Sequence, residues 1–227
     1  MTIHHHISDA LLLDYAAGSL EEGWSLAVAT HLSLCPHCRK RLVGMEMIAG
    51  AMLDGLEGSD QATTSLETSW AEIQARLKIS HPEDLRRVQP VASHVSSTKK
   101  AVLPDPLRRY VGGDIDTLKW KPLGLGAYHY PIATGNKAIS VRLLRIPAGL
   151  PVPEHTHAGK ELTVVLCGSF TDSNGRFMRG DFEETDDTII HQPIAEAGED
   201  CICLAVTDAP LRFKSRFMRL IQPLIGI

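Results

Sequence analysis

The hydrophobic positions of the first eighty residues recur at intervals of three and four, which is the period of an α-helix with one apolar face. Ser8 can cap the first such segment, and Ser19 with Glu22 has the spacing of a capping box for the second. The pattern therefore predicts a helical module. Its helices are expected to run from Ser8 to Gly18, from Ser19 to His31, from Pro36 to Gly55 and over about 65–78.

The hydrophobic pattern changes after Leu107, where short apolar runs are separated by Gly, Pro, Asn and Asp. Many short strands at this spacing are typical of a sandwich or a barrel, and a jelly roll is one such fold. The strands are expected at 117–121, 127–132, 138–146, 161–166, 181–184, 201–207 and 211–215. We thus expect an α+β chain of two separate domains, an all-α module at 1–78 and an all-β domain at 107–227, joined by a proline-containing linker at 79–106.

Composition agrees with a packed globular chain, because 44% of the 227 residues are hydrophobic and 22% are charged. No apolar run approaches the roughly 18 residues that a membrane helix needs, and no signal peptide precedes the polar start. We therefore expect a cytoplasmic protein without a membrane partner. Residues 1–78 hold ten acidic and five basic side chains, and an acidic module disfavours direct binding of nucleic acid.

The first cluster of potential metal ligands is His31, Cys35 and Cys38, which fall at i, i+4 and i+7. On a continuous or slightly broken helix this spacing places all three on one face. Two thiolates and an imidazole are three tetrahedral zinc ligands, and one histidine of the run His4–His6 can supply the fourth. A Cys-x-x-Cys pair beside a histidine, in a chain with five cysteines, favours metal ligands over disulfides. We therefore predict a structural zinc site here.

A second cluster lies in the strand region and consists of His155, His157 and Glu161, with His191 thirty residues further on. His155 and His157 alternate along an extended segment, so both side chains face the same way. Three imidazoles and one carboxylate suit zinc, iron, manganese, nickel or copper, and they leave coordination positions for water, oxygen or a small ligand. We expect a divalent metal here, zinc before iron, manganese or nickel.

The segment 31–38, His-Leu-Ser-Leu-Cys-Pro-His-Cys, resembles the signature of the zinc-binding anti-sigma factor family. The residues from Ile3 to Leu12 are similar to the ChrR branch of that family. This resemblance implies that His6 is the fourth zinc ligand, while the sequence itself leaves the two histidines before it open. It also implies a partner, because the flanking helices of the family clasp a sigma factor of the extracytoplasmic-function type.

The second cluster resembles the first cupin motif in full, from Gly149 through the two histidines and Glu161 to Gly168. The second cupin motif is partly present, since Gly180-Asp181 starts it and His191 falls at the expected distance. ChrR-type proteins also carry a C-terminal cupin. The resemblance therefore implies a jelly-roll barrel whose metal is held by the four residues of the second cluster, and it implies oxidant signals such as singlet oxygen and related peroxides.

Two further cysteines, Cys201 and Cys203, lie two residues apart on a predicted strand, so both can face the barrel interior. We interpret them as core residues and keep redox-active thiols as the alternative. Neighbours on a regular strand are poorly placed to form a disulfide with each other. Cys167 is also expected in the core.

Together the two clusters predict a transcriptional regulator and not an enzyme. The hypothesis is an anti-sigma factor that binds and inhibits an extracytoplasmic-function-type sigma factor and releases it on oxidative stress sensed by the cupin. The alternative is a cupin metalloenzyme, a dioxygenase or isomerase, with a regulatory zinc module. That alternative is weakened because no general acid or base can be read beyond Glu161 and the metal ligands.

Overall fold

A computed structural model describes residues 2–56, 66–79 and 101–213 of the chain. The chain divides into two compact units, of which one joins Met1–Ile48 to Ala101–Ile227 and the other is Ala49–Lys100. The predicted domain boundaries stay a prediction, because most of the expected linker lies outside the described residues. Among the described residues, no helix is long and apolar enough to cross a membrane.

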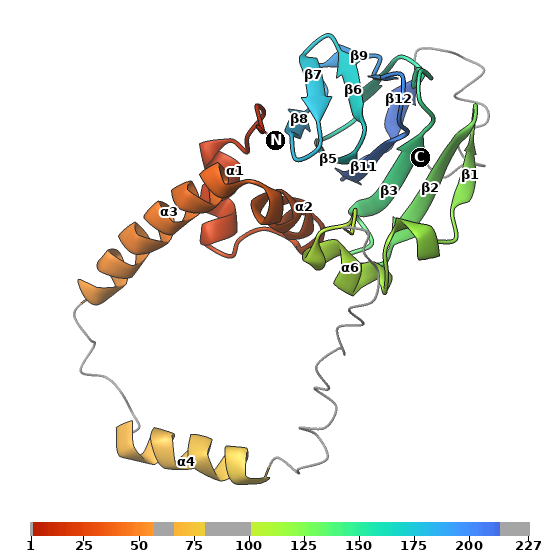
Figure 1. Cartoon of the computed structure of the whole chain (residues 1–227). Helices are drawn as coiled ribbons and strands as arrows, with labels where there is room; N and C mark the ends of the chain where they lie inside the picture. Colours follow the sequence, from red (N-terminus) through yellow and green to blue (C-terminus); the bar gives the residue numbers. More distant parts are fainter. Residues whose placement is uncertain (1, 57–65, 80–100, 214–227) are drawn as a thin grey trace. The chain divides into compact units, whose positions relative to one another are not determined.

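The four helices predicted for the N-terminal region are present (Figure 1). Ser8 caps the first, because its Oγ accepts a hydrogen bond from the Leu11 amide at 3.3 Å. Pro36 is the first residue of the third, as predicted, since a helix start needs no amide donor there. The helices are α1 (Asp9–Ala16), α2 (Glu22–Leu34), α3 (Pro36–Asp54) and α4 (Leu66–Ile79).

The capping box predicted at the start of α2 is wrong. Ser19 Oγ donates to the Asp14 carbonyl at 3.0 Å instead of capping α2. The Glu22 carboxylate accepts from the Tyr110 hydroxyl at 2.8 Å and from the Gly135 amide, and these hydrogen bonds lower its pKa. Glu22 therefore links the start of α2 to Tyr110 and Gly135, which lie 88 and 113 residues further along the chain, and does not cap its own helix.

Residues 105–117 also differ from the prediction. They form a helix, α6 (Asp105–Val111), and a short 3-10 turn, η1 (Ile115–Thr117). The strand predicted at 117–121 is wrong, because Thr117 Oγ1 donates to the Asp114 carbonyl at 2.7 Å and closes the turn. Strand β1 begins only where this turn has ended.

Twelve strands follow within the described residues 101–213 (Figure 1), and those predicted at 127–132 and 201–207 have the predicted bounds. Strands β4, β6, β7, β9 and β10 are two to four residues long, too short to show a period in the sequence, and were not predicted. The last predicted strand is present over 211–213, and residues 214–215 lie outside the described residues. The strands are β1 (Lys121–Gly124), β2 (Ala127–Ile132), β3 (Ser140–Ile146), β4 (His155–His157), β5 (Glu161–Cys167), β6 (Ser169–Asp172), β7 (Gly175–Met178), β8 (Phe182–Thr185), β9 (Ile190–His191), β10 (Ile194–Ala195), β11 (Cys201–Thr207) and β12 (Leu211–Phe213).

The strands pair in three antiparallel sheets. The largest has the order β1-β2-β3-β11-β5-β8, and the two smaller sheets have the orders β10-β6-β7 and β12-β4-β9. Non-consecutive neighbours such as β3, β11 and β5 show that the chain crosses over instead of running as a simple meander. The helical N-terminal region and this all-β region confirm the α+β fold class.

Strands β3, β5 and β11 of the large sheet bury side chains on both faces, whereas the edge strand β1 is mostly exposed. One face packs in a single hydrophobic cluster with α1 and α2, through Val141, Leu143, Val164, Leu204 and Val206. The other face belongs to a smaller cluster that includes Ile146, Val165, Phe170, Cys201 and Cys203. The first cluster joins the helices to the sheet, and the second fills the barrel interior.

Gly23 allows α2 to approach the sheet closely. A Cβ atom added at Gly23 would lie 2.7 Å from Ile139 Cγ2 and 2.9 Å from Val141 Cγ2. Real Cβ atoms do not approach carbon this closely, because interiors are close-packed. Any larger residue at Gly23 would therefore push α2 away from the sheet.

Candidate functional site

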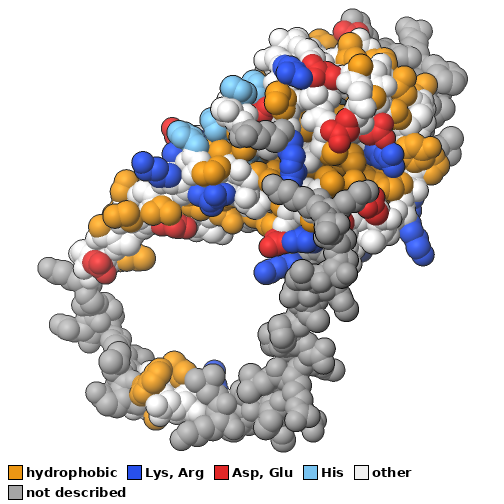
Figure 2. Space-filling view, in the orientation of Figure 1, with side chains coloured by type: hydrophobic (Ala, Val, Ile, Leu, Met, Phe, Trp, Pro, Cys, Tyr) orange, Lys and Arg blue, Asp and Glu red, His pale blue; other side chains and the backbone are white. Residues whose placement is uncertain are grey.

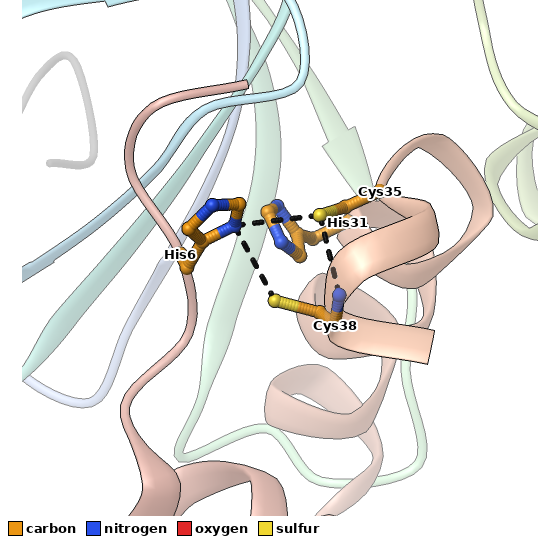
Figure 3. Close-up of side chains that lie close together, drawn as sticks. All are labelled: His6, His31, Cys35 and Cys38. Carbon is orange, nitrogen blue, oxygen red and sulfur yellow. Dashed lines mark hydrogen bonds between the residues drawn. The ribbon is translucent and has the colours of Figure 1, made fainter. Parts of the chain in front are cut away.

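The N-terminal cluster brings together side chains from the arm before α1, from α2, from the α2–α3 junction and from α3 (Figure 3). His6 lies on the extended arm before α1, His31 on the last turn of α2, Cys35 at the junction with α3, and Cys38 in the first turn of α3. One ligand atom of each lies within 4.8 Å of the others. Because Pro36 favours an extended residue before it, Cys35 leaves the helical conformation, and the break turns the cysteines and histidines toward one point.

The geometry of this group suits a metal ion. His6 Nδ1 lies 3.4 Å from Cys35 Sγ and 3.5 Å from Cys38 Sγ. His31 Nδ1 donates to the Gly180 carbonyl at 2.8 Å, and since a carbonyl only accepts, Nδ1 carries the proton and the lone pair is on Nε2. Among the described residues, His31 Nε2 is buried without a hydrogen-bond partner. A metal ion bound by the four side chains would satisfy that atom.

The charges of the group also suit a bound cation. Burial lowers the pKa of His31 to about 4, so the ring is neutral near pH 7 and can coordinate. Burial raises the pKa of Cys38, which disfavours the thiolate in the absence of a cation. Arg41 Nη1 lies 3.5 Å from Cys38 Sγ and 2.9 Å from the Ile7 carbonyl. The single arginine and a divalent metal would together stabilise the two thiolates.

The structure places His6, and neither His4 nor His5, in the ligand group. The His5 ring is turned away from it, with Nε2 at 3.1 Å from the Arg176 carbonyl and a ring centroid 4.2 Å from that of Phe177. In the structure the arm therefore directs His6, rather than His4 or His5, toward the other three side chains.

The second cluster lies inside the barrel and brings together three buried histidines, His155 and His157 from β4 and His191 from β9. Strands β4 and β9 pair, with His155 directly opposite His191. His191 Nε2 lies 3.1 Å from His155 Nε2 and 3.1 Å from His157 Nε2. The three rings therefore present the same kind of nitrogen to one point.

Hydrogen bonds on the far side of two rings determine which nitrogen faces that point. His155 Nδ1 donates to the Pro153 carbonyl at 2.8 Å, and His191 Nδ1 donates to Asp172 Oδ2 at 2.7 Å. Burial lowers the pKa of His155 to about 4, so its Nε2 carries a lone pair. Nitrogens 3.1 Å apart with lone pairs between them repel unless a cation lies there, and three converging nitrogens fit a metal ion.

Glu161, the fourth predicted ligand, lies beside this group and not within it. Its Oε2 is 2.9 Å from His157 Nδ1, on the other edge of the ring from Nε2, and its Oε1 accepts from Thr163 Oγ1 at 3.1 Å. The structure therefore brings three of the four predicted ligands together and leaves the carboxylate in contact with one of them.

Two carboxylates near His191 were missed by the sequence analysis. Asp172 accepts from His191, and Glu183 Oε1 lies 3.8 Å from His191 Nδ1 and accepts from Asn174 at 3.2 Å. Burial, together with the nearby Asp172 carboxylate, raises the pKa of Glu183 to about 8. No motif spacing links these residues to His191; the one signal is that Glu183 occupies an inward position of a predicted strand.

Cys201 and Cys203 belong to neither ligand group and are buried in the barrel cluster. Their Sγ atoms lie 3.5 Å apart, and neither forms a disulfide. The hydrogen bond with Cys201, together with burial, raises the pKa of Cys203 well above its ordinary value. Cys167 is half-buried, and its thiol donates to Glu199 at 3.1 Å. The raised pKa values of Cys203 and Cys167 make these two thiols weak nucleophiles.

The chain is similar to known proteins over regions that include both ligand groups. The ChrR cupin-like domain family matches residues 109–210. The chain is 46% identical over 230 residues to the anti-sigma-E factor ChrR of Cereibacter sphaeroides, with 100% of each chain covered. It is also similar to the crystal structure of Rhodobacter sphaeroides SigE in complex with the anti-sigma ChrR, with a TM-score of 0.75 and 40% identity over 91% of this chain and 99% of that chain.

Proposed function

The chain belongs to the ChrR family of anti-sigma factors, and we propose that it binds and inhibits a sigma factor of the extracytoplasmic-function type. The observation that carries this proposal is the 46% identity over the full length to a protein named as an anti-sigma-E factor. A similar ChrR chain has been solved in complex with SigE. Both names favour a regulator over the metalloenzyme alternative. Because sigma factors act on RNA polymerase, the place of action is the cytoplasm.

Helix α3 offers an exposed apolar face for such a partner (Figure 2). Val43, Met47 and Ile48 on this helix are 52% to 71% exposed, and Met47 is the most exposed of the three. A contiguous apolar face marks a protein interaction site, and methionine adapts its shape to a partner. We assign the sigma contact to this face, which consists of Val43, Met47 and Ile48.

In the helical module, we assign zinc to His6, His31, Cys35 and Cys38. Two thiolates and two imidazoles give a closed tetrahedral site, which is typical of structural zinc. The bound ion would supply charge neutralisation of the thiolates. The residues would tie the N-terminal arm to the junction of α2 and α3, so that the start of the sigma-binding helix is held in place.

In the barrel, we assign a divalent metal to His155, His157 and His191, with Glu161 as the predicted fourth ligand. Zinc is favoured, and iron, manganese or nickel also suit this donor set. We propose that this site senses oxidative stress of the singlet-oxygen or peroxide type. Release of the sigma factor then requires that the protein binds it less well after the barrel has been changed by the oxidant than in the resting state.

Transcription in vitro tests the sigma assignment. The purified chain should inhibit a promoter that depends on an extracytoplasmic-function-type sigma factor of the same organism, and Met47→Glu should weaken binding by about tenfold or more, as loss of an interface anchor does. The matched control is Ile190→Glu, at a barrel residue that is 60% exposed. If the unchanged chain neither binds nor inhibits the sigma factor, the proposal is wrong.

A further inference from the structure

The turn between β7 and β8, residues 179–181, lies against the N-terminal arm that carries His6. The Asp181 carboxylate accepts two backbone hydrogen bonds from this arm, from the His4 amide at 2.7 Å and from the His5 amide at 2.9 Å, both to Oδ1. Its Oδ2 accepts from the Met178 amide at 2.8 Å. Asp181 is only 1% exposed, so these charge-assisted bonds form out of contact with water, where they are strong.

The neighbours of Asp181 hold the same arm and the same metal group. The Gly180 carbonyl accepts from His31 Nδ1, and the Phe182 amide donates to the His5 carbonyl at 3.1 Å. A Cβ atom at Gly180 would lie 2.6 Å from Ile3 Cδ1, and its φ of 93° is in the left-handed region. The arm and the turn therefore fit each other only with glycine at this position.

Two of the four N-terminal ligands are thus oriented by the barrel and two are not. The imidazole of His31 is fixed by the Gly180 carbonyl, and His6 directly follows the two amides that Asp181 holds. By contrast, Cys35 and Cys38 are positioned by the α2–α3 junction, and Cys38 donates its own amide to Cys35 Sγ at 3.4 Å.

We propose that the β7–β8 turn is an outer shell of the N-terminal metal site, in which Gly180 and Asp181 are positioning residues for His31 and His6. The metal affinity of the helical module then depends on the barrel, even though the barrel donates no ligand. This inference rests on the zinc assignment proposed above for His6, His31, Cys35 and Cys38.

A route from the barrel metal group to the turn exists in the same hairpin. Strand β8 continues from Asp181 to Glu183, which lies 3.8 Å from His191 Nδ1. Asn174, in the turn between β6 and β7, donates a hydrogen bond to Glu183. A displacement of β8 that accompanies a change at His191 would reach Asp181 within two residues, so the two metal groups are joined by one short element.

Cobalt titration of the full-length protein tests the proposal. Cobalt bound by cysteine thiolates gives a charge-transfer absorption that a histidine site lacks, so the N-terminal site can be followed separately, and competition with a chelator measures its affinity. Asp181→Ala should weaken cobalt binding at the thiolate site by about 10- to 100-fold, and Asp181→Asn, which keeps one acceptor oxygen, should weaken it less.

The matched control is Asp200→Asn. Asp200 also holds a turn of the barrel, through the Ala148 amide at 3.2 Å and Arg145 at 2.8 Å, but it touches neither ligand group. It should leave the thiolate site unchanged. An unchanged affinity in Asp181→Ala would overturn the inference, whereas absence of the thiolate band in the unchanged protein would overturn the zinc assignment itself.

If Asp181→Ala also loses the barrel metal, the variant has unfolded and does not test the proposal. A second variant is then needed that leaves the barrel unchanged. His4→Pro removes one of the two donor amides and leaves every barrel residue in place. It should weaken cobalt at the thiolate site by severalfold while the barrel keeps its metal. Equal affinity in His4→Pro and the unchanged protein would contradict the positioning role.

Discussion

The two metal-ligand groups differ in where the groups that orient their histidines come from. In the barrel, His155 donates to the Pro153 carbonyl and His191 to the Asp172 carboxylate, and all of these residues belong to the barrel. In the helical region, His31 donates to the carbonyl of Gly180, which lies 149 residues further along the chain. The barrel site is therefore self-contained, whereas the N-terminal site depends on how the helices pack against the barrel.

Burial does not distinguish the two groups, because it lowers the pKa of His31 and of His155 alike to about 4. The difference lies in the outer hydrogen bonds, which commonly change metal affinity by about 10- to 100-fold. A barrel that orients ligands of a neighbouring module can change that module without sharing a ligand with it. This is the physical basis that coupling between a sensing site and a partner-binding helix requires.

Loss of a thiolate should separate the two sites most strongly. Cys35→Ser should remove the N-terminal zinc and sigma inhibition together, because small metal modules fold on their metal. Metal analysis should show one zinc fewer per chain, with the barrel metal retained. Cys167→Ser is the control, since that thiol is outside both groups. Zinc and inhibition that persist in Cys35→Ser would show that the ligand assignment is wrong.

Loss of a barrel histidine should have the opposite pattern. His191→Ala should remove the barrel metal and abolish induction by oxidants, while the resting protein still inhibits its sigma factor. His129→Ala, on β2 and outside both groups, should respond as the unchanged protein does. Reporter-gene induction with and without photosensitised singlet oxygen measures the effect. Normal induction in His191→Ala would mean that the barrel metal is not the sensor.

Removal of the Asp172 charge, which lies behind His191, should have a smaller effect on metal binding than loss of a ligand. Asp172→Asn keeps the size of the side chain but removes the charge that holds His191 Nδ1 at 2.7 Å. Barrel-metal affinity should fall about 10- to 100-fold, and the thiolate site should fall much less. Chelator competition on both sites checks this. A larger loss at the thiolate site than in the barrel would contradict the self-contained character of the barrel group.

A change in the packing of α2 should have the smallest effect of these variants and act mainly on the N-terminal site. Gly23→Val should lower the free energy of unfolding by about 1–3 kcal/mol, because the added side chain overpacks the contact with Ile139 and Val141. Since α2 carries His31, the N-terminal metal should weaken more than the barrel metal.

The matched control for Gly23→Val is Gly44→Ala on α3, where nothing lies within 4 Å of an added Cβ. It should raise the free energy of unfolding by roughly 0.5–1 kcal/mol, because alanine favours the helix over glycine. Urea unfolding measures both variants. Equal stability of the two variants would show that α2 does not pack on the sheet as described.

Elements with a long local period were predictable, and short ones were not. The helices α1 to α4 and the strands β2 and β11 follow from residues that are neighbours in the sequence. The capping box at Glu22 was wrong because a distant hydroxyl and a distant amide compete for the same carboxylate. Helix α6 was missed because it is seven residues long and its buried Leu107 packs in the tertiary core.

The kind of chemistry expected at each site could be predicted from residues that are neighbours in the chain. The spacing of His31, Cys35 and Cys38 brings the three together across the helix break at Cys35, and His155 and His157 share a side of a strand, because local backbone geometry decides these directions. These spacings and the resemblance were sufficient to predict two metal sites and an anti-sigma family.

The groups that complete and orient those sites could not be read from the sequence and appear in the folded chain. It placed His6 rather than His4 or His5 in the first group, put Asp172 and Glu183 behind His191, and brought Gly180 and Asp181 to the N-terminal arm. The physical reason is that these contacts join residues far apart in the sequence, so they depend on how the helices and sheets pack and leave no period or spacing in the chain.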